Sequence, residues 1–168
     1  SICSLIPRKN VMAILTSFKQ IKSKDSVLIF VGDGSLKKEM LSVKSNEENI
    51  IFLGHQNEIP ELLNIADLFI SISLSEGFPL NVAEANSIGL PMILSNISPN
   101  REHFTEKELK LGRIKFLDLN NFLDDNLQES IVEMLDKYSG EKIYNLKSDL
   151  RSSEMSKLYE MEYLNLIK

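Results

Sequence analysis

Residues 68–91 read LFISISLSEGFPLNVAEANSIGLP, and this stretch contains in order a strand, a loop and a helix. The run 68–72 is almost continuously apolar, as expected of a parallel strand that is covered on both faces. The loop carries glycine and proline, and the helix after it ends at Gly89, a residue suited to the left-handed position beyond a last turn. The stretch therefore predicts one strand-loop-helix unit of a parallel α/β sheet.

The same alternation of strand and helix continues through nearly the whole chain. Five further apolar runs predict strands: 2–5, 27–31, 50–53, 92–94 and 114–117. Apolar residues recur at helical spacing in 11–21 and 127–138, while Asn57 is a candidate helix N-cap with Pro60 in the first turn. The pattern predicts a doubly wound parallel sheet of about six strands with helices on both faces, a Rossmann-like fold. Residues 145–168 predict a C-terminal helix with no strand after it.

Composition excludes several classes of protein. The 168 residues fit one domain, and the net charge of −5 argues against a nucleic-acid partner. A single cysteine, Cys3, and two distant histidines, His55 and His103, argue against a disulfide scaffold and a metal site. No apolar run approaches the ~20 residues that span a bilayer. We expect a cytoplasmic domain without metal or cofactor, and the strand-like start at Ser1 suggests a piece of a longer protein.

The richest loop for chemistry follows the 68–72 strand, because ligands of open α/β sheets bind beyond the carboxyl ends of the strands. It places Glu76 before the helix and Glu84 about one turn inside it. The main-chain N–H groups that can point at an anion belong to Gly77, Phe78, Leu80 and Asn81. A diphosphate bound there would lie between two carboxylates, which suit sugar hydroxyls as hydrogen-bond acceptors.

Two ordinary structural interpretations compete with this site. Asn81 and Glu84 have the spacing of a helix capping box, and Glu76 fits a solvated loop acid. The loop Gly32-Asp33-Gly34 predicts a tight turn, since Lys37 occupies the third glycine position of a dinucleotide-binding fingerprint.

Residues 76–91 closely resemble the acidic signature of family 4 retaining glycosyltransferases, in which two glutamates separated by seven residues precede a small-residue helix and Gly-x-Pro. Other segments match landmarks of that family in the same order: 7–10, 31–34, 36–39, 49–54 and 66–70. The resemblance covers residues 2–134. It implies the C-terminal, nucleotide-sugar-binding domain of a two-domain GT-B enzyme, spanning 1–168, with the N-terminal acceptor domain absent from this chain.

The resemblance implies a role for each matching residue. Glu84 would accept from the ribose hydroxyls, Glu76 would contact the donor sugar, and Lys9 would neutralise the leaving diphosphate, which makes Glu76 and Lys9 the catalytic pair. Backbone donors would come from Gly77, Phe78 and Leu80, and the base would lie near Gly54, His55 and Gln56. The implied donor is a UDP- or GDP-sugar. The acceptor, a sugar or a lipid-linked sugar, would bind the missing domain. The implied pathway is the synthesis of a surface polysaccharide or glycoconjugate, and the full protein could associate peripherally with a membrane.

The chain also departs from the family pattern. Cys3 and Ser4 occupy the places of the arginine that usually pairs with the lysine, and we expect Arg8 to face away in an extended loop, which leaves Arg101 as an alternative cation. Residues 97–102 replace a Gly-Gly-x-x-Glu loop. These departures keep two alternatives open: a non-catalytic nucleotide-binding module of the same fold, and an epimerase-like GT-B relative.

Overall fold

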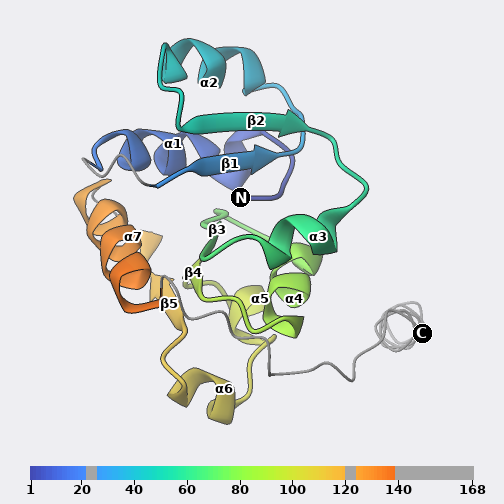
Figure 1. Cartoon of the computed structure of the whole chain (residues 1–168). Helices are drawn as coiled ribbons and strands as arrows, with labels where there is room; N and C mark the ends of the chain where they lie inside the picture. The colour runs from blue at the N-terminus through green and yellow to red at the C-terminus, as the bar shows by residue number, and fades with distance from the viewer. Residues whose placement is uncertain (22–25, 120–123, 139–168) are drawn as a thin grey trace.

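The computed structural model describes residues 1–21, 26–119 and 124–138, which form two parallel sheets (Figure 1). In one sheet, β1 (Leu28–Val31) pairs with β2 (Ile50–Gly54). In the other, β4 (Met92–Ser95) lies between β3 (Phe69–Ser71) and β5 (Ile114–Leu117). Every pairing is parallel, which confirms the predicted α/β class.

The first predicted strand, over residues 2–5, is wrong. The segment makes a single parallel bridge, between Ile2 and Val31, so the described residues carry five strands in two sheets and not six in one. Beyond the bridge, the N–H of Leu5 donates 2.9 Å to the carbonyl of Asp33. The segment therefore continues beyond β1 and lies against the loop that follows this strand. The approach is close: a Cβ on Gly34 would lie 2.4 Å from the Leu5 oxygen, so only glycine fits at this position.

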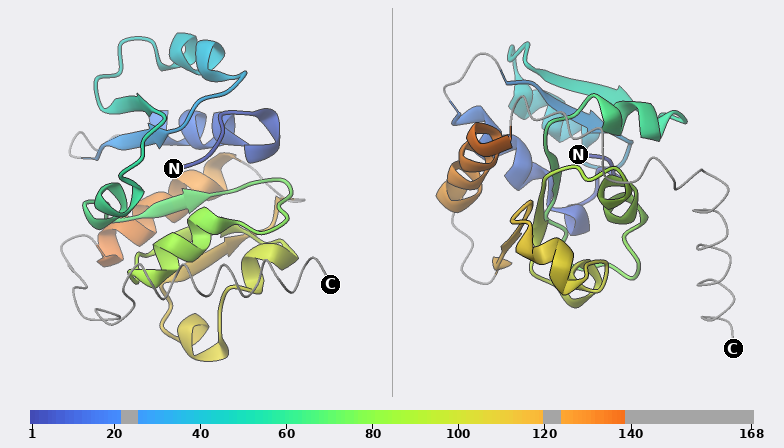
Figure 2. Two further views of the ribbon diagram at one scale, coloured as in Figure 1. Left: turned by 90° about the vertical axis from the view of Figure 1, so that its right-hand side faces the viewer. Right: turned by 60° about the horizontal axis from the view of Figure 1, so that its bottom comes forward.

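Helices connect the strands. Their bounds are η1 (Pro7–Lys9), α1 (Val11–Lys19), α2 (Lys37–Lys44), α3 (Ile59–Asn64), α4 (Leu80–Ser87), α5 (Ser98–Arg101), α6 (Glu106–Lys110) and α7 (Asp124–Tyr138). α1 packs against α7, and the views in Figure 2 place α7 and α4 on opposite sides of the β3-β4-β5 sheet. The helices predicted in 11–21 and 127–138 are confirmed.

The core divides in two along the faces of this sheet. Ile93 of β4 packs in a cluster with Leu127 and Ile131 of α7. Its neighbours in the strand, Met92 and Leu94, pack in a second cluster that includes α4. Successive strand residues point to opposite faces, so the alternation confirms that helices cover both sides.

Helix ends agree with the sequence in part. Gly89 has φ of 73° just beyond α4, as predicted. Pro60 lies in the first turn of α3, but the N-cap is Glu58, so the prediction for Asn57 is wrong by one residue.

The predicted helix over 145–168 lies outside the described residues. Within the described ranges, no helix is long and apolar enough to cross a membrane.

Candidate functional site

Glu76 is the centre of a charged cluster in the loop between β3 and α4. Its Oε1 accepts a 2.5 Å hydrogen bond from Nζ of Lys9, and its Oε2 lies 3.5 Å from Nη1 of Arg8. Only 5% of the Glu76 side chain is exposed, against 14% for Lys9 and 50% for Arg8. The structure thus brings together Lys9 and Glu76, the two residues predicted to be catalytic, and excludes the interpretation of Glu76 as a solvated loop acid.

Arg8 belongs to this cluster, contrary to expectation. Its carbonyl accepts from the N–H of Leu74 at 2.8 Å, and its guanidinium donates to the carbonyl of Ser75 at 2.9 Å. The prediction of an extended loop is wrong because Pro7–Lys9 forms a 3-10 turn. Successive side chains of an extended segment point to opposite sides, whereas those of a tight turn can reach the same partner. Arg101 lies elsewhere, bonded to Asn96 and stacked over Phe116.

The backbone donors predicted for an anion are partly available. The N–H groups of Gly77 and Phe78 make no hydrogen bond within the described part of the chain. The N–H of Leu80 instead donates 3.0 Å to the carbonyl of Phe78, so its predicted role as an anion donor conflicts with this bond. An ideal Cβ built on Gly77 meets nothing within 4 Å, which leaves open space beside Glu76.

Glu84 lies half-buried on α4, in surroundings unlike those of Glu76. Burial raises the pKa of the Glu84 carboxyl above its ordinary value. Among the described residues, no hydrogen bond or ion pair engages that carboxylate. Unpaired and partly desolvated, it is the acceptor that a pair of sugar hydroxyls suits.

The capping box considered for Asn81 and Glu84 does not form. The N-cap of α4 is Pro79, with no side-chain cap. Nδ2 of Asn81 donates 2.7 Å to the carbonyl of Ile2, and its Oδ1 accepts from the N–H of Val82. Asn81 therefore ties the first turn of α4 to the N-terminal segment, which leaves Glu84 free of a capping role.

The residues predicted to lie near the nucleotide base, 54–56, lie at the end of β2 and directly after it. Gly54 has φ of 69°, and Nε2 of Gln56 donates 2.8 Å to the carbonyl of Leu53. The carbonyl of Gly54 accepts from the N–H of Gly32, which holds the ends of β1 and β2 together. His55 is exposed. Among the described residues, no hydrogen bond or ion pair joins 54–56 to the Glu76 cluster.

Two features were missed from sequence, one beside the Glu76 loop and one on α6. The ring of Phe78, 41% exposed, lies edge-on to His103 with centroids 4.7 Å apart. Their contact joins residues 25 positions apart in sequence, and no local pattern signals it. Thr105 and Glu108 form a capping box on α6, and here the spacing Thr-x-x-Glu was a usable signal.

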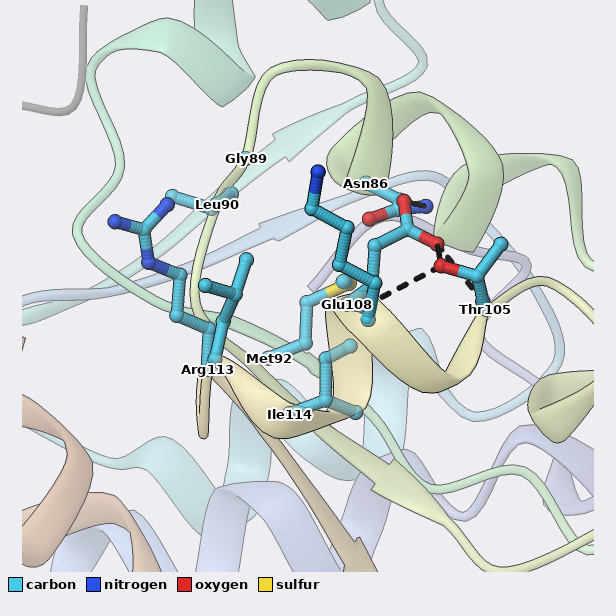
Figure 3. A pocket seen from close by; sticks show the side chains of 10 residues that line it. Asn86, Gly89, Leu90, Met92, Thr105, Glu108, Arg113 and Ile114 are labelled. Atoms are coloured by element: carbon cyan, nitrogen blue, oxygen red, sulfur yellow. Dashed lines mark hydrogen bonds between the residues drawn. The ribbon is translucent and has the colours of Figure 1, made fainter. Parts of the chain in front are cut away.

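A cavity of about 290 Å³ lies away from this cluster (Figure 3). Met92 and Ile114, the first residues of β4 and β5, line it together with Asn86, Glu108 and Arg113. It therefore opens at the amino ends of these strands, whereas the Glu76 loop follows the carboxyl end of β3. The ranges that the structure describes contain no group of three His, Cys, Asp or Glu side chains that could hold a metal ion.

The comparisons with known proteins define the class. A family described as "Glycosyl transferases group 1" matches residues 1–147, so the chain belongs to this family. A relative is the Escherichia coli UDP-Gal:alpha-D-GlcNAc-diphosphoundecaprenol alpha-1,3-galactosyltransferase, 32% identical over 152 residues, covering 84% of this chain and 39% of the relative. The chain spans less than half the length of such curated relatives.

Solved structures confirm the fold, and two of them are described here. Anabaena HepE, solved with UDP and glucose, gives a TM-score of 0.69 at 17% identity, covering 98% of this chain and 46% of that one. The catalytic domain of cholesterol-alpha-glucosyltransferase from Helicobacter pylori gives 0.66 at 21% identity, covering 99% and 96%. At these identities the likeness extends to the fold alone.

Proposed function

We propose that this chain is the nucleotide-sugar-binding domain of a retaining group 1 glycosyltransferase that uses a UDP-sugar. Its product would be a surface polysaccharide or another glycoconjugate. The observation that carries the proposal is the Lys9–Glu76 pair in the loop after β3, next in sequence to Gly77 and Phe78, whose N–H groups make no hydrogen bond with the described residues. UDP is favoured over GDP because the E. coli relative is named for UDP-Gal and HepE was solved with UDP.

The chemistry assigned to the site is departure of the nucleoside diphosphate. Lys9 and the backbone dipoles stabilise the negative charge that develops on the leaving diphosphate, a contribution that operates without a metal ion. Glu76 accepts from hydroxyls of the donor sugar and positions it. Glu84, whose carboxylate has no partner among the described residues, accepts from the ribose hydroxyls.

The second half of the reaction belongs to another domain. Among the described residues, the proposed donor site offers no side chain placed as a nucleophile. The acceptor site and any general base would belong to an N-terminal domain across a cleft. We therefore expect this chain alone to bind nucleotide weakly and to transfer little or no sugar. Measurable transfer by the chain alone would contradict this division of labour.

The test is thermal unfolding of the chain against UDP, GDP, ADP, CMP and dTDP, repeated with Glu84→Ala. At a ligand concentration about tenfold above Kd, the native state gains about 1.4 kcal/mol, a rise of about 4 °C in Tm for a domain of this size. We expect the rise with UDP, its loss in Glu84→Ala, and its retention in Glu39→Ala, an exposed glutamate of α2. The absence of a rise with UDP up to millimolar concentration would contradict the proposal.

A further inference from the structure

Arg8 is attached to the Glu76 loop by both its backbone and its side chain. The backbone bond from Leu74 to the Arg8 carbonyl holds the two loops together whatever the side chain at position 8. The guanidinium adds the 2.9 Å bond to Ser75 and the 3.5 Å contact with Glu76. The side chain is therefore aimed at the loop but is not required to join it.

The cluster carries more positive than negative charge. Lys9 and Arg8 contribute two cations to one carboxylate, so the cluster has a net charge of +1. Lys9 is mostly buried in its bond with Glu76, whereas half of the Arg8 side chain is open to solvent. Arg8 is thus the more accessible cation of the cluster, and the Lys9–Glu76 bond is made by a different carboxylate oxygen from the one that Arg8 contacts.

The uncharged residue at position 4 is the reason why Arg8 matters as a second cation beside Lys9. Ser4 is exposed and uncharged, although the family pattern usually has an arginine at this place. A diphosphate carries more than one negative charge, and a lone lysine acts on it as a single point charge. A guanidinium presents a planar fork of donors that fits phosphate oxygens in a bidentate manner.

We infer that Arg8 contacts the nucleotide diphosphate together with Lys9. Arg8 thereby supplies the positive charge of the arginine that the family pattern usually has at position 4. The inference rests on the proposed function, because it assigns a further residue to the same donor site. On binding, the guanidinium exchanges its contact with Glu76 for phosphate oxygens, while the backbone bond to Leu74 keeps the loop in place.

The experiment compares UDP and uridine binding by titration calorimetry in wild type, Arg8→Gln, the double variant Ser4→Arg/Arg8→Gln, and Lys38→Gln. Glutamine keeps an NH2 donor at position 8 but lacks the positive charge and the guanidinium fork of arginine. Loss of a charge-assisted hydrogen bond of about 1.5–3 kcal/mol predicts about tenfold weaker UDP binding or more, with uridine binding unchanged. The double variant should recover UDP affinity, and Lys38→Gln, an exposed residue of α2, should retain it.

The outcomes separate this inference from the proposed function. Equal UDP binding by wild type and Arg8→Gln, with loss in Glu84→Ala, would overturn the role of Arg8 and leave the donor site intact. An equal loss of UDP and uridine binding in Arg8→Gln would make Arg8 a support of the loop and also overturn the inference. A wild-type chain that fails to bind UDP would overturn both.

Discussion

The ammonium group of Lys9 donates a 2.5 Å hydrogen bond to a carboxylate oxygen of Glu76, across 67 residues of sequence. The bond joins the loop before α1 to the loop before α4, at the carboxyl end of β3. Because the Glu76 side chain is only 5% exposed, water screens this pair less than it screens a surface pair. Removal of either partner would therefore leave a charge in this partly buried place without its counter-charge.

Glu76→Gln should destabilise the chain without ligand. The substitution keeps the shape of the side chain but leaves Lys9 and Arg8 as adjacent cations without their carboxylate. Weakening hydrogen bonds to a partly buried charge costs about 1–3 kcal/mol, measured by urea unfolding. The matched control is Glu133→Gln, whose pair with Lys115 is exposed and whose loss should cost about 0–1 kcal/mol. Equal costs for the two variants would contradict this account of Glu76.

Gly34→Ala should unfold or severely destabilise the chain. The new Cβ would lie 2.4 Å from the oxygen and 2.6 Å from the carbonyl carbon of Leu5, both backbone atoms that cannot move away independently. Gly77→Ala is the control, since its Cβ meets nothing within 4 Å and neither glycine has positive φ. Thermal unfolding should place Gly77→Ala within about 1 kcal/mol of wild type. A folded, equally stable Gly34→Ala protein would show that residues 2–5 do not cross the loop this closely.

How much could be predicted from sequence depends on how local the cause is. The strands in 68–72, 92–94 and 114–117 follow from short apolar runs, and the structure contains β3, β4 and β5 within or near these bounds. The path of residues 2–5 depends on close backbone contacts with Gly32 and Gly34, about 30 residues away in sequence. The apolar pattern of residues 2–5 does not indicate these contacts.

The candidate site divides in the same way. Glu76 was predicted from a spaced glutamate motif and Lys9 from the resemblance of residues 7–10 to a basic loop, and the structure brings the two side chains together. The direction of Arg8 was not predictable, because it depends on a 3-10 turn at Pro7–Lys9 that replaces an extended loop. The bond that engages the N–H of Leu80 depends on how the chain turns at Phe78 and Pro79, which residue types alone do not specify.

Asn81→Asp should destabilise the junction between α4 and the N-terminal segment. A carboxylate cannot donate to the Ile2 carbonyl, so the 2.7 Å bond becomes a repulsion between two acceptors. The expected cost is about 1–3 kcal/mol, reduced by about 0.3–1 kcal/mol because a negative charge is favourable near a helix N-terminus. Asn57→Asp, at an exposed position, is the isosteric control and should change stability by about 0.5 kcal/mol or less. Denaturant unfolding that ranks the two variants equally would contradict the assigned bond.

The burial of Glu84 should make the free energy of unfolding depend on pH, with a sign that follows from the direction of its pKa shift. Desolvation raises the pKa of the folded-state carboxyl above about 4.5, its value in an unfolded chain. Between these two pKa values the folded state binds more protons than the unfolded state, so the free energy of unfolding falls as the pH rises through this window and then stays lower. The ionised Glu84 therefore lowers the stability of the chain without ligand at neutral pH.

Glu84→Gln removes the ionisation and should be more stable than wild type at neutral pH. The difference should fade at about pH 4, where the wild-type carboxyl is protonated in both states. Urea unfolding of the two proteins at about pH 4 and pH 7 measures it, with Glu39→Gln on α2 as an exposed control. The same Glu84→Gln protein should lose UDP binding, because the carboxylate that costs stability is the acceptor assigned to the ribose. A variant less stable than wild type at neutral pH would show that a favourable partner offsets the desolvation of Glu84.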